Sequence, residues 1–300
     1  MREKSKRLLP TLSVLAAGCL WGSMGLFVRT LGAQGLPSMA IVCIRSLVTA
    51  ALTALFCALF CRQRLRVRLR DLWCFAGTGL CSVLFFNFCY FHSMTVLPLS
   101  AAAVLLYTAP VFVTVLSAWL FKERITLRKV AAMVLALLGC VLVSGVLGAL
   151  GGAAFGAEGV LAGLGAGFGY ALYSIFSRFA INRGYHPLTV TVYTFVFASL
   201  GSLLLADAAP IGQAVQSGGV QAVLFWVFYA VVTTVLPYLL YTYGLFHIDN
   251  STASVIASVE PVMATLLGFA VFAEVPSVAA AIGMVLVLAA VTVLAKGERG

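Results

Sequence analysis

Apolar runs of about 20 residues alternate with short polar, glycine-rich or proline-rich connections along the whole chain. A bilayer core about 30 Å thick needs about 20 apolar residues per helical crossing. Each run therefore predicts one membrane-spanning helix. The ten predicted spans are 9–31, 37–61, 72–93, 99–121, 127–147, 159–181, 187–206, 220–245, 251–272 and 276–295.

The first run resembles a secretory signal peptide at its start, because the basic stretch from Met1 to Arg7 precedes it and Leu15 to Cys19 faintly resembles a lipoprotein cleavage site. The apolar run nevertheless continues to Leu31 and is long enough to span. We therefore expect a helix of the bundle here.

Lysine and arginine cluster on one side of the predicted bundle. Ten spans return the chain to its starting side, and short cytoplasmic loops carry the positive excess of membrane proteins. We therefore expect a multi-pass protein of the cell (plasma or inner) membrane with both termini in the cytoplasm. The basic residues on that side are Arg2, Lys4, Lys6, Arg7, Arg62, Arg64, Arg66, Arg68, Arg70, Lys122, Arg124, Arg128, Lys129, Arg178, Arg183, Lys296 and Arg299.

The composition excludes an ordinary water-soluble domain. The chain is 62% hydrophobic and 9% charged, whereas soluble domains are about 25% charged. Its formal net charge of +10 comes from short basic clusters between apolar runs, so we expect no nucleic-acid partner. All eight cysteines lie between Cys19 and Cys140 without a Cys-x-x-Cys pair. We expect no metal site and no cofactor.

The second half of the chain repeats the first. Residues 100–124 align without gaps with residues 251–275 and share nine identical positions. Those positions include Ser100/Ser251, Pro110/Pro261, Thr114/Thr265, Phe121/Phe272 and Glu123/Glu274. A similar offset, near 150, relates Trp21-x7-Arg29 to Tyr170-x7-Arg178.

This repeat predicts an all-α integral membrane protein with ten transmembrane helices, arranged as two inverted five-helix repeats. The expected repeats are 9–147 and 159–295, joined by a Gly/Ala-rich linker at 148–158. Because each repeat has an odd number of spans, the second crosses the membrane in the opposite sense. Secondary transporters with this organisation bind substrate near the midplane, where the two halves meet.

Several motifs resemble those of the drug/metabolite transporter superfamily, specifically of proteins with two EamA-type repeats. They are Leu20-Trp-Gly-Ser23 followed by Arg29, the stretch Ala40 to Arg45, the two aligned segments, and Ser258-Val-Glu-Pro-Val262. The resemblance implies a carrier of small metabolites, often moving them outward. The two halves depart from each other at Ala109, where the second half has Glu260.

Glu260 is the strongest candidate for substrate or ion binding. It lies nine residues after Ser251, which places it about 14 Å along the helix. Ionisable groups at such depth usually face a cavity or a partner. Pro261 lacks a backbone N–H and should free the Ala257 carbonyl, as Pro110 should free Leu106 beside Tyr107. Glu260 either binds a proton, cation or amine, or it is protonated and supports the kink.

Aromatic and amide side chains recur at matching positions. Asn87 and Tyr90 map onto Tyr238 and Tyr241, and Trp21 maps onto Tyr170. These residues either line a cavity for a flat or zwitterionic solute or pack structurally. Together with Tyr107 and Glu260 they form the predicted substrate-binding set.

Arg45 lies about 12 Å inside the second span, too deep for simple snorkelling. It pairs with an acidic group such as Glu260, holds a substrate carboxylate, or binds helix-end carbonyls, and we favour a structural or gating role. Asp249 to Ser251 has the pattern of an N-cap for the ninth span.

These patterns predict a secondary transporter, an exporter of small metabolites such as amino acids, amines or nucleoside-like solutes. We expect alternating access with Glu260 as the proton or cation coupling residue, in contact only with small-molecule substrate and membrane lipid, as a monomer or homodimer. A passive channel is the main alternative. A membrane-embedded enzyme is disfavoured, because no paired aspartates or His-Glu-x-x-His motif lies at mid-membrane depth.

Overall fold

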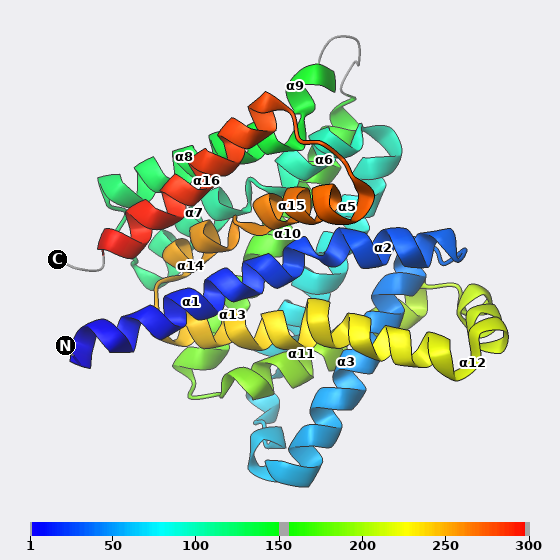
Figure 1. Cartoon of the computed structure of the whole chain (residues 1–300). Coiled ribbons are helices and arrows are strands. Elements are labelled where there is room, and N and C mark those ends of the chain that lie inside the picture. Colours follow the sequence, from blue (N-terminus) through cyan, green and yellow to red (C-terminus); the bar gives the residue numbers. More distant parts are fainter. Residues whose placement is uncertain (1, 150–155, 298–300) are drawn as a thin grey trace.

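The computed structural model describes residues 2–149 and 156–297, so residues 150–155 of the predicted linker lie outside it. Within this part the chain is helical, and ten helical segments are long and apolar enough to span a membrane. Both termini lie at one end of the bundle (Figure 1). The predicted fold class is confirmed.

The first five spans contain several interruptions. Their helices are α1 (Arg2–Gly22), α2 (Met24–Ala33), α3 (Ser38–Phe60), α4 (Leu72–Ala76), the π-helix η3 (Gly77–Leu84), α5 (Phe85–Val96), α6 (Leu99–Leu106), α7 (Ala109–Phe121) and α8 (Leu127–Ser144). Two 3₁₀ turns, η1 (Arg62–Leu65) and η2 (Leu69–Asp71), join α3 to α4, and the short α9 (Val146–Ala149) follows α8. The first span, predicted as one helix, is broken at Ser23.

The second five spans follow the same plan. Their helices are α10 (Ala157–Asn182), α11 (Pro187–Leu205), α12 (Ala208–Ala230), the π-helix η4 (Val231–Val235), α13 (Leu236–His247), α14 (Asn250–Ala257), α15 (Glu260–Phe272) and α16 (Val278–Gly297). The predicted start of the eighth span at residue 220 coincides with a break in α12 at Gly219, and the helical stretch that precedes this break, beginning at Ala208, was not predicted. The Asp207 carboxylate caps the start at Ala208 by accepting the Ala209 N–H at 3.0 Å, and Gly219 breaks the helix with a φ of 53°.

Backbone irregularities repeat at an offset of 151 residues. The helix break between α6 and α7 matches the break between α14 and α15, and η3 overlaps the position of η4. Lys122 and Ala273 both end their helices with a φ of 56°. Because unrelated helices would not share such defects at one offset, the two halves are structural copies of each other.

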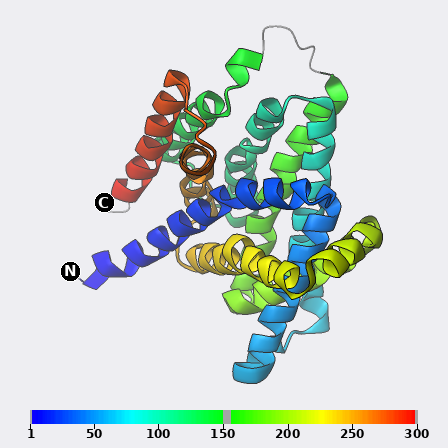
Figure 2. The same ribbon diagram turned by 45° about the vertical axis from the view of Figure 1, so that its right-hand side comes forward.

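Contacts between the halves follow the repeat: the contact of the first span with the eighth is matched by that of the sixth with the third, and the fifth span contacts its own counterpart, the tenth. Helix α1 packs along α13, α10 packs along α5, and α8 packs along α16. The last pair lies at the edge of the molecule in both views (Figure 1, Figure 2). Gly139 and Gly283 face each other there, and a Cβ on either would lie within 2.7 Å of the carbonyl oxygen of the other. Such close approach of backbones is typical of small residues between membrane helices.

Substitution of Gly139 by alanine tests this contact. The added methyl group has no room, so we expect the free energy of unfolding to fall by about 1–3 kcal/mol, measured on the purified protein in detergent. The control is Gly25→Ala in α2, where a Cβ meets nothing within 4 Å and alanine should stabilise the helix by about 0.5–1 kcal/mol. Equal stability of the two variants would contradict the packing described here.

Candidate substrate cavity and gate

Two broken helices meet near the centre of the bundle. The fourth span is interrupted at Tyr107 and Thr108, and the ninth at Ser258 and Val259. The two prolines predicted kinks in continuous helices. Instead, Pro110 and Pro261 occupy the first turn of new helices, where proline is favoured because the N–H it lacks has no intrahelical partner.

Glycines from the opposite half cover both breaks. Gly18 of α1 lies against Ala257, whose carbonyl oxygen would be 2.9 Å from an added Cβ. Gly167 of α10 lies equally close to Leu105 and its carbonyl oxygen. Each half therefore closes over the irregular backbone of the other, which keeps those polar groups away from lipid.

A small pocket lies between the two breaks and contains Glu260. Its lining residues are Leu106, Tyr107, Ala109, Pro110, Tyr170, Ser254, Ala257, Ser258 and Glu260. The nearest hydrogen-bond partner of the Glu260 carboxylate is the Tyr170 hydroxyl, at 3.5 Å. Within the described residues no cation lies in ion-pair distance of Glu260. The pocket thus presents one carboxylate without a counter-charge.

A second, aromatic pocket adjoins the first through Tyr170. It is lined by Trp21, Ser82, Phe86, Tyr170, Tyr173, Ser174, Tyr238 and Tyr241. Trp21 stands edge-on to Tyr238, with ring centroids 5.3 Å apart. The Tyr241 hydroxyl and Ser174 are hydrogen-bonded at 2.8 Å. This pocket offers flat aromatic surfaces and hydroxyl groups.

The two pockets bring together six of the predicted binding residues: Trp21, Tyr107, Tyr170, Tyr238, Tyr241 and Glu260. Asn87 and Tyr90 line neither pocket. The Asn87 amide is buried, donates to the Val83 carbonyl at 2.6 Å and accepts from Arg45. Tyr90 stacks on Phe86. Tyr173 and Ser174, which also line the aromatic pocket one helical turn beyond Tyr170, were not predicted.

Arg45 does not pair with Glu260, one of the partners considered for it. Its guanidinium donates to Asn87 Oδ1 at 3.1 Å and to Met24 Sδ at 3.3 Å. The side chain is 4% exposed, and no carboxylate in the described part of the chain lies within ion-pair distance. Arg45 therefore joins the second span to the start of α2 and to α5, just beyond the π-helix η3.

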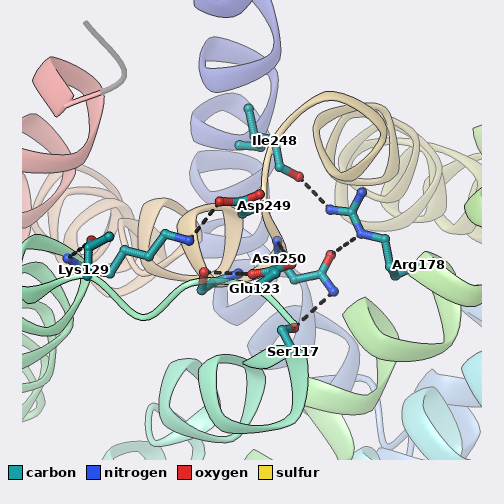
Figure 3. Close-up of polar contacts among 9 residues, drawn as sticks. Ser117, Glu123, Lys129, Arg178, Ile248, Asp249 and Asn250 are labelled. Carbon is teal, nitrogen blue, oxygen red and sulfur yellow. Dashed lines mark hydrogen bonds and ion pairs between the residues drawn. The ribbon is translucent and has the colours of Figure 1, made fainter. Parts of the chain in front are cut away.

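A polar network surrounds the start of α14 (Figure 3), near the end of the bundle that carries the termini (Figure 1). The Glu123 carboxylate accepts the backbone N–H groups of Asn250 at 3.0 Å and Ser251 at 3.3 Å, and also the Ser251 hydroxyl at 2.9 Å. An anion at a helix N-terminus is stabilised by the free N–H groups and the helix dipole. Glu123 thus caps α14 from another span.

Arg178 and Lys129 complete this network, which we call the gate. Arg178 donates to Asn250 Oδ1 at 2.8 Å and to the Ile248 carbonyl at 2.6 Å, and Asn250 donates to Ser117 at 3.1 Å. Lys129 pairs with Asp249 at 2.7 Å. Asp249 occupies the predicted N-cap position, but its side chain makes no capping bond. The repeat was the available signal for the gate, because it aligned Glu123 with Glu274 and Arg29 with Arg178.

The equivalent residues at the opposite end make different contacts. Glu274 pairs with Arg29 at 2.7 Å, and both side chains are 54% exposed. Leu99, the counterpart of Asn250, is 60% exposed. The polar network of the gate is therefore formed at one end of the bundle. At the other end, Glu274 makes no described hydrogen bond to the start of α6.

Ten apolar spans in two inverted halves, with broken helices at the centre, are the architecture of secondary transporters. The chain belongs to the EamA-like transporter family, whose pattern matches residues 8–145 and 157–296. The predicted family is thereby confirmed. The protein is a multi-pass membrane transporter and not an enzyme.

Relatives with curated names are also transporters. An "Uncharacterized transporter" of Archaeoglobus fulgidus is 30% identical over 64% of this chain and 65% of its own length, just under two thirds. "Uncharacterized transporter YxxF" of Bacillus subtilis is 24% identical over 90% of this chain and 84% of its own length. A protein of known crystal structure is 23% identical to this chain. The two structures align over 98% of this chain and 100% of the other with a TM-score of 0.78, which shows that they share a fold.

Replacement of Glu123 by alanine tests the cap on α14. Loss of a helix cap costs about 1–2 kcal/mol, so backbone amide exchange at Asn250 and Ser251 should become about 5- to 30-fold faster. Hydrogen exchange with mass spectrometry measures this. The matched control is Glu274→Ala, which removes the equivalent carboxylate at the other end and should leave exchange at these two residues unchanged.

Proposed function

We propose that this protein is an alternating-access exporter of small metabolites such as amino acids, amines or nucleoside-like solutes. One observation carries the proposal: Glu260 presents a carboxylate with no counter-charge from any described residue, beside Tyr107 and Tyr170 and between two broken helices from opposite halves. A carboxylate in this position binds a proton or a cationic group. The aromatic pocket beside it can stack on a flat solute.

In this proposal, proton coupling arises because a proton and the substrate bind in turn to the Glu260 carboxylate. Glu260 lies near the middle of the ninth span, where a charge without a partner is costly. A proton neutralises this charge when the site is empty, and the amino group of a substrate neutralises it when the site is filled. Competition between the two for Glu260 would drive substrate outward as protons enter.

Alternating access is supported by the symmetry of the gate. Glu123 holds the start of α14 at the end that carries the termini. By the repeat, Glu274 is placed to hold the start of α6 at Leu99 and Ser100 in the opposite state. In the present state Glu274 binds Arg29 instead. A passive channel would not need two such alternatives, and saturable counterflow would distinguish a carrier from a channel.

We propose that the protein lies in the plasma or inner membrane of the cell, with both termini in the cytoplasm. The basic loops near the termini support this orientation. In this orientation the gate closes the cytoplasmic end.

Glu260→Gln tests the coupling residue. In proteoliposomes loaded with a panel of amino acids, amines and nucleosides, we expect a pH gradient to accelerate wild-type efflux of the transported solute. The variant should lose this acceleration, because glutamine neither binds nor releases a proton, and its counterflow of a cationic solute should be weaker, because glutamine cannot neutralise the amino group. Glu158→Gln is the control, since Glu158 is an exposed partner of His92. A pH response retained by Glu260→Gln would contradict the assignment.

Paired cysteine substitutions test the two states of the gate. In a chain whose eight native cysteines are replaced, Glu123→Cys with Ser251→Cys should cross-link in the resting protein. Glu274→Cys with Ser100→Cys should cross-link only when transported solute is supplied. Each cross-link should stop flux, and reductant should restore it. Cross-linking of both pairs at rest, or of neither pair during transport, would refute an exchange of gates.

A further inference from the structure

Five arginines alternate with other residues between Arg62 and Arg70, on the connection from the second span to the third. The backbone is extended at Arg66 and Arg68, so successive side chains point to opposite sides. Leu65 and Val67 pack inward against apolar residues of α11 and α4. Arg64, Arg66 and Arg68 are consequently exposed on the other side.

Three hydrogen bonds fix this segment to the second half of the protein. The Thr189 hydroxyl donates to the Arg64 carbonyl at 2.8 Å, and the Tyr193 hydroxyl donates to the Leu65 carbonyl at 2.6 Å. The Arg68 N–H donates to the Tyr185 hydroxyl at 3.1 Å. All three bonds use backbone atoms of the arginine segment, so they do not occupy the guanidinium groups of Arg64, Arg66 and Arg68.

The segment and the connection between α10 and α11 enclose an arginine pocket. Its lining residues are Gln63, Arg64, Arg66, Val67, Arg68, Arg183, Gly184, Tyr185, His186 and Thr189. The nearby acid, Asp71, is 5% exposed and already binds the Tyr185 hydroxyl at 2.7 Å and Arg183 at 3.1 Å. Arg64, Arg66 and Arg68 form no ion pair with any described residue.

The positive charge of the pocket comes from its arginines. Burial and the neighbouring Arg64 lower the pKa of His186. The Leu188 N–H donates to His186 Nδ1 at 3.2 Å, which requires that nitrogen to be unprotonated. Near pH 7 the His186 side chain is therefore uncharged, and it lines the cationic pocket without adding to its charge.

The equivalent pocket in the second repeat shows that the fold does not require this charge. Residues 213–221 occupy the position of residues 62–70 at the offset of 151 and contain no lysine or arginine. The pocket there is lined by Gln34, Ala214, Ser217, Gly218, Gln221, Ala222 and Phe225. Equivalent positions in the two repeats thus carry a neutral pocket at one end of the bundle and a cationic pocket at the other, although residues 213–221 belong to α12 and residues 62–70 form 3₁₀ turns and extended backbone.

The arginine pocket lies at the edge of the apolar surface. Trp73 is 42% exposed, and the Arg183 guanidinium lies 4.9 Å from the centroid of its ring. Leu69 is 85% exposed. Tryptophan and arginine with exposed apolar neighbours are typical of the headgroup level of a membrane.

We propose that the arginine pocket binds a phosphate group at the membrane surface. Guanidinium groups match phosphate oxygens with paired hydrogen bonds, and basic pockets between spans bind anionic headgroups. Phosphatidylglycerol in the surrounding leaflet and a soluble phosphate ester present the same chemistry. Because the pocket joins the connection after the second span to the start of α11, a bound phosphate would hold the two halves together at this end.

Lipid nanodiscs test the proposal with the intact chain. Phosphatidylglycerol, compared with phosphatidylcholine alone, should raise the unfolding temperature of the wild type and remain bound in native mass spectrometry. The variant Arg64→Gln with Arg68→Gln should bind this lipid at least about tenfold more weakly. The matched control, Arg62→Gln with Arg70→Gln, makes the same charge change outside the pocket and should respond like the wild type.

A second arm separates the two sources of phosphate. Glycerol 3-phosphate is added to protein in phosphatidylcholine nanodiscs, and a rise in unfolding temperature that requires Arg64 and Arg68 would identify a soluble ligand. Arg64→Lys with Arg68→Lys keeps the charge and should restore only part of the response. Equal losses in the pocket and control variants, or no response to either phosphate, would overturn the proposal.

Discussion

The need to satisfy backbone polar groups inside the membrane governs this structure. Irregular backbone is tolerated at membrane depth only where protein covers it, and the fourth and ninth spans both contain such backbone. Gly18 and Gly167 allow the spans of the opposite half to approach these breaks within contact distance. The two halves therefore cannot separate freely at the centre, and the place where they must stay together is also the place where the pockets lie.

Several charged side chains near the ends of spans have partners within the protein, whereas those deep inside spans have no partner of opposite charge among the described residues. Glu123, Asp249 and Asp71 lie near the ends of spans and have partners within the protein. Glu260 and Arg45 lie inside spans and lack a partner of opposite charge in the described part. A buried ion without a counter-ion is destabilising, which makes these two residues the places where an external proton or solute would gain most by binding.

The sequence predicts the spans and the repeat because both depend on local pattern. Apolar length alone locates nine spans to within a few residues, and the offset of 151 already relates Pro110 to Pro261 in the amino-acid sequence. Long-range pairing is different. The bonds from Arg45 to Asn87 and from Glu123 to Asn250 join residues 42 and 127 positions apart, and no local pattern selects these partners among several polar residues. The helical stretch between Ala208 and the break at Gly219 was not predicted, because its glycine and glutamine content is typical of a loop.

The side chains break the symmetry that the backbone keeps. At the offset of 151, Ser117 becomes Gly268, Asn250 becomes Leu99, Asp249 becomes Pro98 and Lys129 becomes Ala280. Only Glu274, Ser100 and Arg29 could rebuild a gate at the other end, without the amide and the ion pair that support Glu123. A mirror-image state would therefore have fewer polar contacts, and the equilibrium between two such states favours the one with more. In the proposed alternating-access cycle, the unequal side chains would therefore make closure at the end of the termini the resting state.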